Sequence, residues 1–236
     1  MNIKEFDNRR DVLFAKTTNE AVRFAADHWI KTAQRAIAKK GSFSVALSGG
    51  STPKTLYELL TSFYADQLDW SKVLLFWSDE RAVPPSHPES NYYMVMKSGF
   101  SKLPVQIFRM MAEGEIEANA KKYDALIREK LGPSLFDLVM LGVGEDGHTA
   151  SLFPNTEALK ITDALVAANF IPEKKCWRMT LTFPCINQSR QAVFYALGAS
   201  KRSIVQAILN TPFDSPYPAS LIGTSERKAL WICSEF

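Results

Sequence analysis

The chain has 236 residues, of which 46% are hydrophobic, and its 28 basic and 25 acidic residues give a formal net charge of +3. This length and hydrophobic content suit one large α/β domain or two small ones. The sequence contains no long basic run and no nucleic-acid-binding motif, which argues against a nucleic-acid partner. No apolar stretch approaches the ~18 residues that a membrane span needs.

The cysteines, Cys176, Cys185 and Cys233, are odd in number and form no CxxC pair, which favours free thiols in a reducing compartment. The first residues are charged and lack the apolar segment of a secretory signal. We therefore expect a cytoplasmic protein without a membrane partner. No two histidines have metal-ligand spacing, so we expect no metal site.

The first predicted elements are a helix, a strand and a second helix. Residues 17–40 carry an apolar stripe at helical spacing, with Thr17 and Glu20 placed as a capping box. A short buried strand and a glycine turn then lead into a helix. Thr52 is expected to be the N-cap of that helix, with Pro53 at its first position.

The alternation of helices and strands continues to the end of the chain. A strand is predicted from Val73, ending in the charged triplet Asp79–Arg81. The other predicted helices begin near Asn91 and cover 116–130 and 200–209; the other predicted strands lie within 136–151, 177–184, 191–198 and 228–233.

Near-continuous apolar strands that alternate with helices indicate an α/β fold. We predict a doubly wound, Rossmann-like, mainly parallel sheet with helices on both faces. No repeat or domain linker interrupts the chain, so we expect a single domain over residues 1–236. Ligands of such sheets bind beyond the carboxyl ends of the strands, where residues 48–52, 79–81 and 144–151 should meet.

The segment after the first predicted sheet strand suits an anion. Gly49 and Gly50 let the backbone approach a ligand, and the helix start offers unpaired N–H groups. Ser48, Ser51 and Thr52 add hydroxyl donors. An ordinary strand-to-helix turn remains the alternative, and neither a P-loop nor a GxGxxG motif suggests a nucleotide.

Two cations are predicted in the first turn of the helix over 200–209. Lys201 and Arg202 there oppose the helix dipole at a cost of ~0.3–1 kcal/mol, which a bound anion would reverse. We favour Lys201 as an anion ligand, with two solvated side chains as the alternative. Arg178, before a predicted strand, is a further candidate cation.

The triplet Asp79–Arg81 offers both signs of charge. A buried Asp79 is expected to pair with Arg81 and stay ionised. Arg81 could also hold a phosphate with two hydrogen bonds. Glu80 is either a second carboxylate of the site or a side chain that faces solvent.

His148 lies between glycines in "GEDGHTAS", at the expected functional edge of the sheet. Its near-neutral pKa suits a general base, and Asp146 could orient it or only shape the turn. His28 and His87 are expected at the surface. No GxSxG elbow is present, so a nucleophilic triad with Ser151 is disfavoured and His148 acting on water is simpler.

Several motifs together resemble a known family. The segments occur in this order: "ALSGGSTPKTLYELL", "FWSDERAVPPSHPESNY", "DLVMLGVGEDGHTASLFP", "RMTLT" and "ALGASK". In these segments the chain resembles 6-phosphogluconolactonases, of the glucosamine-6-phosphate isomerase/6-phosphogluconolactonase family, from end to end. The second and third are highly specific in combination, whereas the first alone is not.

The resemblance implies a fold shared with glucosamine-6-phosphate deaminase. It also implies hydrolysis of 6-phospho-D-glucono-1,5-lactone to 6-phosphogluconate in the oxidative pentose phosphate pathway, without a metal or organic cofactor. The chain would act on this small molecule as a monomer or small homo-oligomer. His148 would be the base, and Ser48 and Asp79 would also face the substrate. The phosphate contacts would be Gly49, Gly50, Thr52, Arg81, Arg178 and Lys201.

Two alternatives remain open. A glucosamine-6-phosphate deaminase would share the fold and the DGH turn, but such enzymes resemble one another in a following Phe-Asn-Glu-Pro stretch. Here Ser151, Leu152, Phe153 and Pro154 stand there, with Phe153 in place of the glutamate. The second alternative is a sugar-phosphate-binding regulator, which the presence of His148 disfavours.

Overall fold

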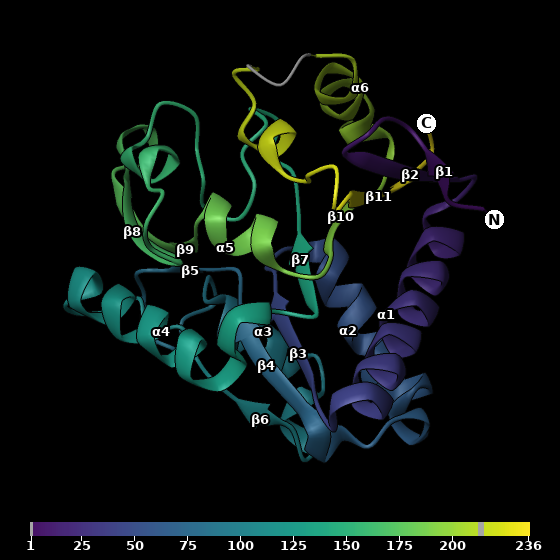
Figure 1. Cartoon of the computed structure of the whole chain (residues 1–236), viewed down its shortest axis with the longest axis horizontal. Helices are drawn as coiled ribbons and strands as arrows, with labels where there is room; N and C mark the ends of the chain where they lie inside the picture. Colours follow the sequence, from purple (N-terminus) through teal and green to yellow (C-terminus); the bar gives the residue numbers. More distant parts are fainter. Residues whose placement is uncertain (1, 212–214) are drawn as a thin grey trace.

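The main sheet of the protein is mostly parallel. The computed structural model describes residues 2–211 and 215–236 (Figure 1). Strand order is β1-β2-β11-β10-β7-β3-β4-β6, and every neighbouring pair is parallel except β1 and β2. The strands are β1 (Lys4–Glu5), β2 (Arg10–Ala15), β3 (Phe43–Leu47), β4 (Val73–Trp77), β6 (Gln106–Ile107), β7 (Leu138–Leu141), β10 (Ala192–Ala196) and β11 (Ala229–Ser234). The predicted α/β class is confirmed.

Helices flank this sheet on both sides, with α1 and α2 on one side and α4 on the other (Figure 1). The α-helices are α1 (Thr18–Lys40), α2 (Ser51–Phe63), α3 (Asn91–Lys97), α4 (Ile116–Leu131), α5 (Phe183–Gln188) and α6 (Arg202–Asn210). The short 3₁₀ helices are η1 (Ala65–Gln67), η2 (Trp70–Lys72), η3 (Phe100–Lys102), η4 (Gly132–Ser134), η5 (Glu157–Lys160), η6 (Pro172–Lys174), η7 (Ala199–Lys201) and η8 (Pro218–Leu221). Within the described part of the chain, no helix is long and apolar enough to cross a membrane.

The ends of α1 agree with the sequence, whereas the start of α2 does not. The Thr17 side chain accepts a hydrogen bond from Glu20 N, and Gly41 closes α1 with φ +83°. The expected Thr52 cap of α2 is wrong, because α2 begins at Ser51 with Gly50 as N-cap and without a side-chain cap. The φ of +106° at Gly50 is a conformation that side chains disfavour, so a glycine makes this sharp turn possible.

Aromatic packing fixes α1 on the sheet. Trp29 of α1 is fully buried, with its ring edge-on to Phe43 at 4.9 Å between centroids. Trp70 stacks on Trp29 at 5.6 Å. Because rings bury large apolar areas and prefer such tilted and offset geometries, this cluster anchors the helix that covers β3.

A second, smaller sheet is present besides the predicted, mainly parallel one. It is antiparallel, in the order β5 (Asp79–Arg81), β9 (Cys176–Leu181) and β8 (Val166–Ile171). The predicted strand from Val73 therefore ends at Trp77, and the charged triplet forms a separate strand. Ser78 marks the change: its N–H and Oγ donate to Leu47 O, while its carbonyl accepts from Leu181 N.

Candidate active site

A cavity of about 270 Å³ opens where β3 and β7 end. Every site residue predicted from the sequence lines it except Asp146, which instead contacts His148. Its lining is Ser48, Gly49, Gly50, Ser51, Thr52, Pro53, Asp79, Arg81, Asn91, Gly142, Val143, Gly144, His148, Ala150, Arg178, Tyr195 and Lys201. The structure thus brings together the three polar clusters expected at the carboxyl edge of the sheet.

The start of α2 presents free backbone donors to this cavity. The first helical hydrogen bond runs from Lys54 N to Gly50 O at 3.1 Å. Over residues 2–211 and 215–236, no backbone acceptor pairs with the N–H groups of residues 49–52. Ser48 Oγ is buried and also lacks a partner among these residues. Unpaired donors at a helix start suit an anion, so the anion site stays a prediction with free donors available for it.

Two arginines face each other across the small sheet. Arg81 on β5 pairs in register with Arg178 on β9. The Nε atom of each is buried, with no hydrogen-bond partner in the described part of the chain. The like charges of the two guanidinium groups repel each other. A phosphate between them would offset this repulsion and accept hydrogen bonds from the free N–H groups. Only the fold reveals this pairing, because the two residues lie far apart in sequence.

Lys201 also turns towards the cavity, but from a different element than expected. It ends η7 immediately before α6, and its Nζ donates to Val143 O at 2.9 Å. Arg202 begins α6 and donates instead to Glu235 O, so the two neighbouring cations separate. Lys201 therefore joins the two arginines at the cavity, whereas Arg202 does not line it.

The carboxylates of the triplet differ from the predictions. Asp79 forms no ion pair with Arg81 among the described residues; it accepts hydrogen bonds from Ser151 Oγ at 2.7 Å and Asn91 Nδ2 at 3.3 Å. The expected Asp79–Arg81 pairing is therefore wrong. Because Ser151 Oγ donates its hydrogen bond to Asp79, it is not hydrogen-bonded to His148 as a nucleophilic triad would require.

Glu80 does not face solvent, because only 3% of it is exposed. Its carboxylate accepts hydrogen bonds from four donors: Arg81 N, Ser90 Oγ, Asn91 N and Tyr92 N. Burial raises the pKa of Glu80 despite these hydrogen bonds. Glu80 thereby ties β5 to the start of α3 and holds the segment that carries Asn91.

Asp146 and His148 form a hydrogen-bonded pair. Nδ1 of His148 lies 2.5 Å from Asp146 Oδ1, which also accepts His148 N at 3.1 Å. Burial raises the pKa of Asp146, but these hydrogen bonds outweigh it and hold the pKa below its usual value. An ionised carboxylate only accepts, so Nδ1 carries the hydrogen and Nε2 is the basic nitrogen of the neutral ring.

The other two histidines differ from each other. His87 is exposed, as expected. His28 on α1 is half-buried rather than at the surface, and its Nδ1 is buried without a partner among the described residues. Burial, reinforced by the nearby charge of Arg35, lowers the pKa of His28 to about 4. Neither residue lines the cavity.

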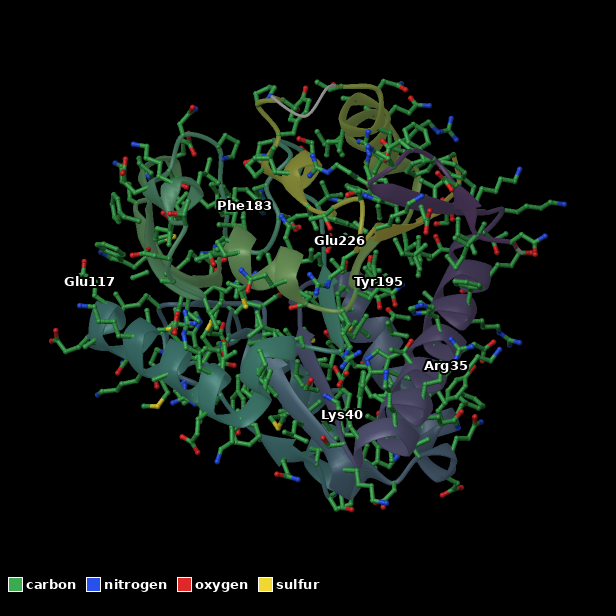
Figure 2. The ribbon with its side chains drawn as sticks, viewed as in Figure 1. Arg35, Lys40, Glu117, Phe183, Tyr195 and Glu226 are labelled. Atoms are coloured by element: carbon green, nitrogen blue, oxygen red, sulfur yellow. The ribbon has the colours of Figure 1, made fainter. Side chains whose placement is uncertain are left out.

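Sequence reasoning missed two polar residues of the cavity. Asn91 is 2% exposed, and its Nδ2 donates to Asp79 O at 2.8 Å. Tyr195 of β10, labelled in Figure 2, is buried with an unpartnered hydroxyl in the described part of the chain, and burial raises its pKa. Asn91 was predicted only to begin a helix, and Tyr195 lies in an apolar strand, so no local pattern distinguished either residue.

The cysteines are free, and within residues 2–211 and 215–236 no group of His, Cys, Asp and Glu side chains could hold a metal ion. Cys185 and Cys233 are buried, and burial raises the pKa of both thiols. Neither of these two cysteines lines the cavity.

Comparisons with known proteins agree with the architecture and the motifs. The model of glucosamine-6-phosphate isomerases/6-phosphogluconolactonase matches residues 16–231. A 6-phosphogluconolactonase of Chlamydia pneumoniae is 39% identical over 234 residues, covering 97% of this chain and 90% of that protein. One of Nostoc sp. is 37% identical over 207 residues, covering 84% of each.

A solved structure has the same fold. The 6-phosphogluconolactonase of Thermotoga maritima superposes with a TM-score of 0.82 at 28% identity, covering 95% of this chain and 99% of that one. The matched region includes every residue that lines the cavity. The chain therefore belongs to the glucosamine-6-phosphate isomerase/6-phosphogluconolactonase family.

Proposed function

We propose that this protein hydrolyses 6-phospho-D-glucono-1,5-lactone to 6-phospho-D-gluconate, as a carboxylic ester hydrolase of the pentose phosphate pathway. The observation that carries the proposal is the pair of Asp146 and His148 at the cavity that also holds three cations and a free helix start. A base and an anion site together suit a phosphorylated substrate with an electrophilic carbon. The cytoplasmic location and the single domain over residues 1–236 stay predictions from the sequence.

The phosphate would anchor the substrate. Its charge would be met by Arg81, Arg178 and Lys201, with the N–H groups of residues 49–52 as further donors. Binding energy from this remote group orients the lactone for attack at C1. Asp79 and Ser48 would contact the sugar, because both lie at the cavity and carry acceptors for hydroxyl groups.

His148 would act on water. Nε2 removes a proton while the water oxygen bonds to C1, and the carbonyl electron pair moves onto its oxygen. The resulting oxyanion would be stabilised by those cations or N–H donors at this edge that the phosphate does not occupy. The bond from C1 to the ring oxygen then breaks, and the imidazolium returns its proton to that oxygen. Ionisation of the new carboxylic acid releases one proton into solution, which is the measurable product.

The deaminase alternative has little support at the site. Phe153 occupies the position at which that branch would carry a glutamate, and it is 2% exposed. Its ring stacks on His148 at 3.9 Å between centroids. A phenyl ring cannot transfer a proton during ring opening, so we assign the lactonase branch rather than the deaminase branch.

The test adds purified protein to freshly prepared 6-phosphogluconolactone at near-neutral pH and follows acid release above the spontaneous rate. His148→Ala should lose about 10²–10⁴-fold in kcat while still binding 6-phosphogluconate, because general acid–base catalysis supplies that factor. His87→Ala, at an exposed histidine outside the cavity, is the matched control. A wild-type protein that does not accelerate hydrolysis overturns the proposal, and glucosamine 6-phosphate would then be the next substrate.

If His148→Ala hydrolyses the lactone as fast as the wild type, the substrate assignment stands, but the imidazole is not the base. Binding of phosphosugars without turnover of either substrate would instead favour the sugar-phosphate-binding regulator. These outcomes separate the two alternatives that the sequence leaves open.

A further inference from the structure

The imidazole of His148 is held on more sides than the mechanism requires. Asp146 binds Nδ1 at its edge. The backbone of Gly144 packs against the ring, since a Cβ on residue 144 would lie 2.1 Å from Nδ1. Phe153 covers a face of the imidazole, with centroids 3.9 Å apart and ring planes inclined by 15°. The hydrogen bond at one edge does not prevent the imidazole from rotating out of its plane and off Asp146, whereas a stacked ring on its face restricts that rotation.

Phe153 is itself rigidly placed. Its carbonyl accepts a hydrogen bond from Thr156 Oγ1 at 2.7 Å. Asn169 of β8, which is 1% exposed, donates from Nδ2 to Thr156 Oγ1 at 3.0 Å and to Ser151 O at 2.9 Å. The segment that carries Phe153 is therefore fastened at two points to the small sheet.

Phe153 also has a cation nearby. Lys174 Nζ lies over the Phe153 ring at 5.7 Å from its centroid. Attraction between a cation and the ring restrains the phenyl group further. The phenyl ring therefore interacts both with Lys174 of η6 and with the imidazole.

From these contacts we propose that Phe153 is a positioning residue for the base. Its ring fixes the imidazole in the plane that keeps Nδ1 on Asp146 and leaves Nε2 available to water. The kinetic consequence rests on the proposed lactonase function, whereas the effect on the imidazole does not. Phe153 does not line the cavity, so it acts through His148 rather than on the substrate.

The test compares Phe153→Leu with Phe153→Tyr, which keeps an aromatic face. Two measurements are made: lactone kinetics, and the ¹⁵N NMR spectrum of the His148 imidazole in the free protein. Phe153→Leu should lower kcat about three- to tenfold with KM unchanged, the factor expected for loss of one aromatic pair. Its spectrum should show a mixture of tautomers in place of the Nδ1-protonated form. Phe153→Tyr should restore both properties.

Phe43→Leu is the matched control, because Phe43 is fully buried and edge-on to Trp29 but does not line the cavity. It should lower the melting temperature without changing the imidazole spectrum or kcat. A Phe153→Leu protein with a wild-type tautomer overturns the inference, whatever its activity. If the wild type does not hydrolyse the lactone, the proposed function fails, and the NMR comparison still decides the role of Phe153.

Discussion

A methyl group on residue 49 should destabilise the protein by displacing a buried amide. A Cβ on Gly49 would lie 2.0 Å from Asn91 Oδ1, 2.5 Å from its Cγ and 2.9 Å from its Nδ2. Asn91 is 2% exposed and donates to Asp79 O and Oδ1, so moving the amide loses both hydrogen bonds. The φ of Gly49 lies outside the left-handed region, so steric overlap acts alone.

The magnitude follows from these contacts. Two hydrogen bonds contribute about 0.5–1.5 kcal/mol each, and overpacking costs about 1–3 kcal/mol. Allowing for partial relaxation, Gly49→Ala should lower the free energy of unfolding by about 2–4 kcal/mol. In a chain of this size that corresponds to a fall of about 5–15 °C in melting temperature. Urea and thermal denaturation of the free protein measure both quantities.

Two further variants make the steric explanation specific. Gly142 lines the same cavity, but a Cβ there would meet nothing within 4 Å. The free energy of unfolding of Gly142→Ala should therefore stay within about 0.5 kcal/mol of the wild-type value. In an Asn91→Ala background, Gly49→Ala should cost little more, because the overlapping amide is gone. Two results would refute this reasoning: a Gly49→Ala protein with the melting temperature of the wild type, or a double variant in which the two losses of unfolding free energy add.

Three other changes test the charges of the site and the core. Asp146→Asn should lower kcat about 10²-fold with little change in KM, because an amide no longer enforces the Nδ1-protonated form of His148; steady-state lactone kinetics measure this. Arg178→Ala should raise KM for the phosphorylated lactone about 10- to 100-fold but leave hydrolysis of unphosphorylated gluconolactone unchanged, because a charged hydrogen bond is worth about 1.5–3 kcal/mol. The pKa of His28 is about 4 in the folded state against 6.5 ordinarily, so the unfolded chain binds more protons between these values. Stability should therefore fall by up to ~3 kcal/mol as the pH drops from 6.5 to 4, and urea denaturation of His28→Gln should lack this part of the loss.

Each of these predictions has a contrary outcome. If Asp146→Asn keeps the kcat of the wild type, the Asp146 carboxylate has no role in the mechanism. Equal losses on both lactones would show that Arg178 does not act on the phosphate. The same pH dependence in wild type and His28→Gln would assign the acid sensitivity to other groups.

Local chemistry made part of the site predictable. Asp146 and His148 are two residues apart in a glycine turn, so their contact follows from the chain itself. The glycine segment before α2 is equally local, because a helix start leaves N–H groups unpaired wherever it forms. The capping of α1 by Thr17 follows the same logic.

Pairings between distant segments were not predictable in this way. The strand β2, for example, begins with charged residues that hide its apolar pattern, yet Arg10 is 4% exposed and donates to carbonyls of Ile208 and Leu209. The sequence left open whether Glu80 is a site carboxylate or faces solvent, because its donors lie on the backbone of α3, far along the chain. Burial of a charge depends on partners that the local sequence does not contain.

The sequence alone predicted the α/β class, the glycine turn into a helix after β3, and the proximity of Asp146 to His148, because each depends on periodicity or on residues a few positions apart. Only the tertiary structure decided that Arg81 and Arg178 stand side by side, that Asn91 is buried against Gly49, and that Phe153 covers the imidazole. The first two require β5 to leave the main sheet at Ser78, and the last requires loops fastened by β8. Such contacts are set by packing across the whole chain, which no local pattern encodes.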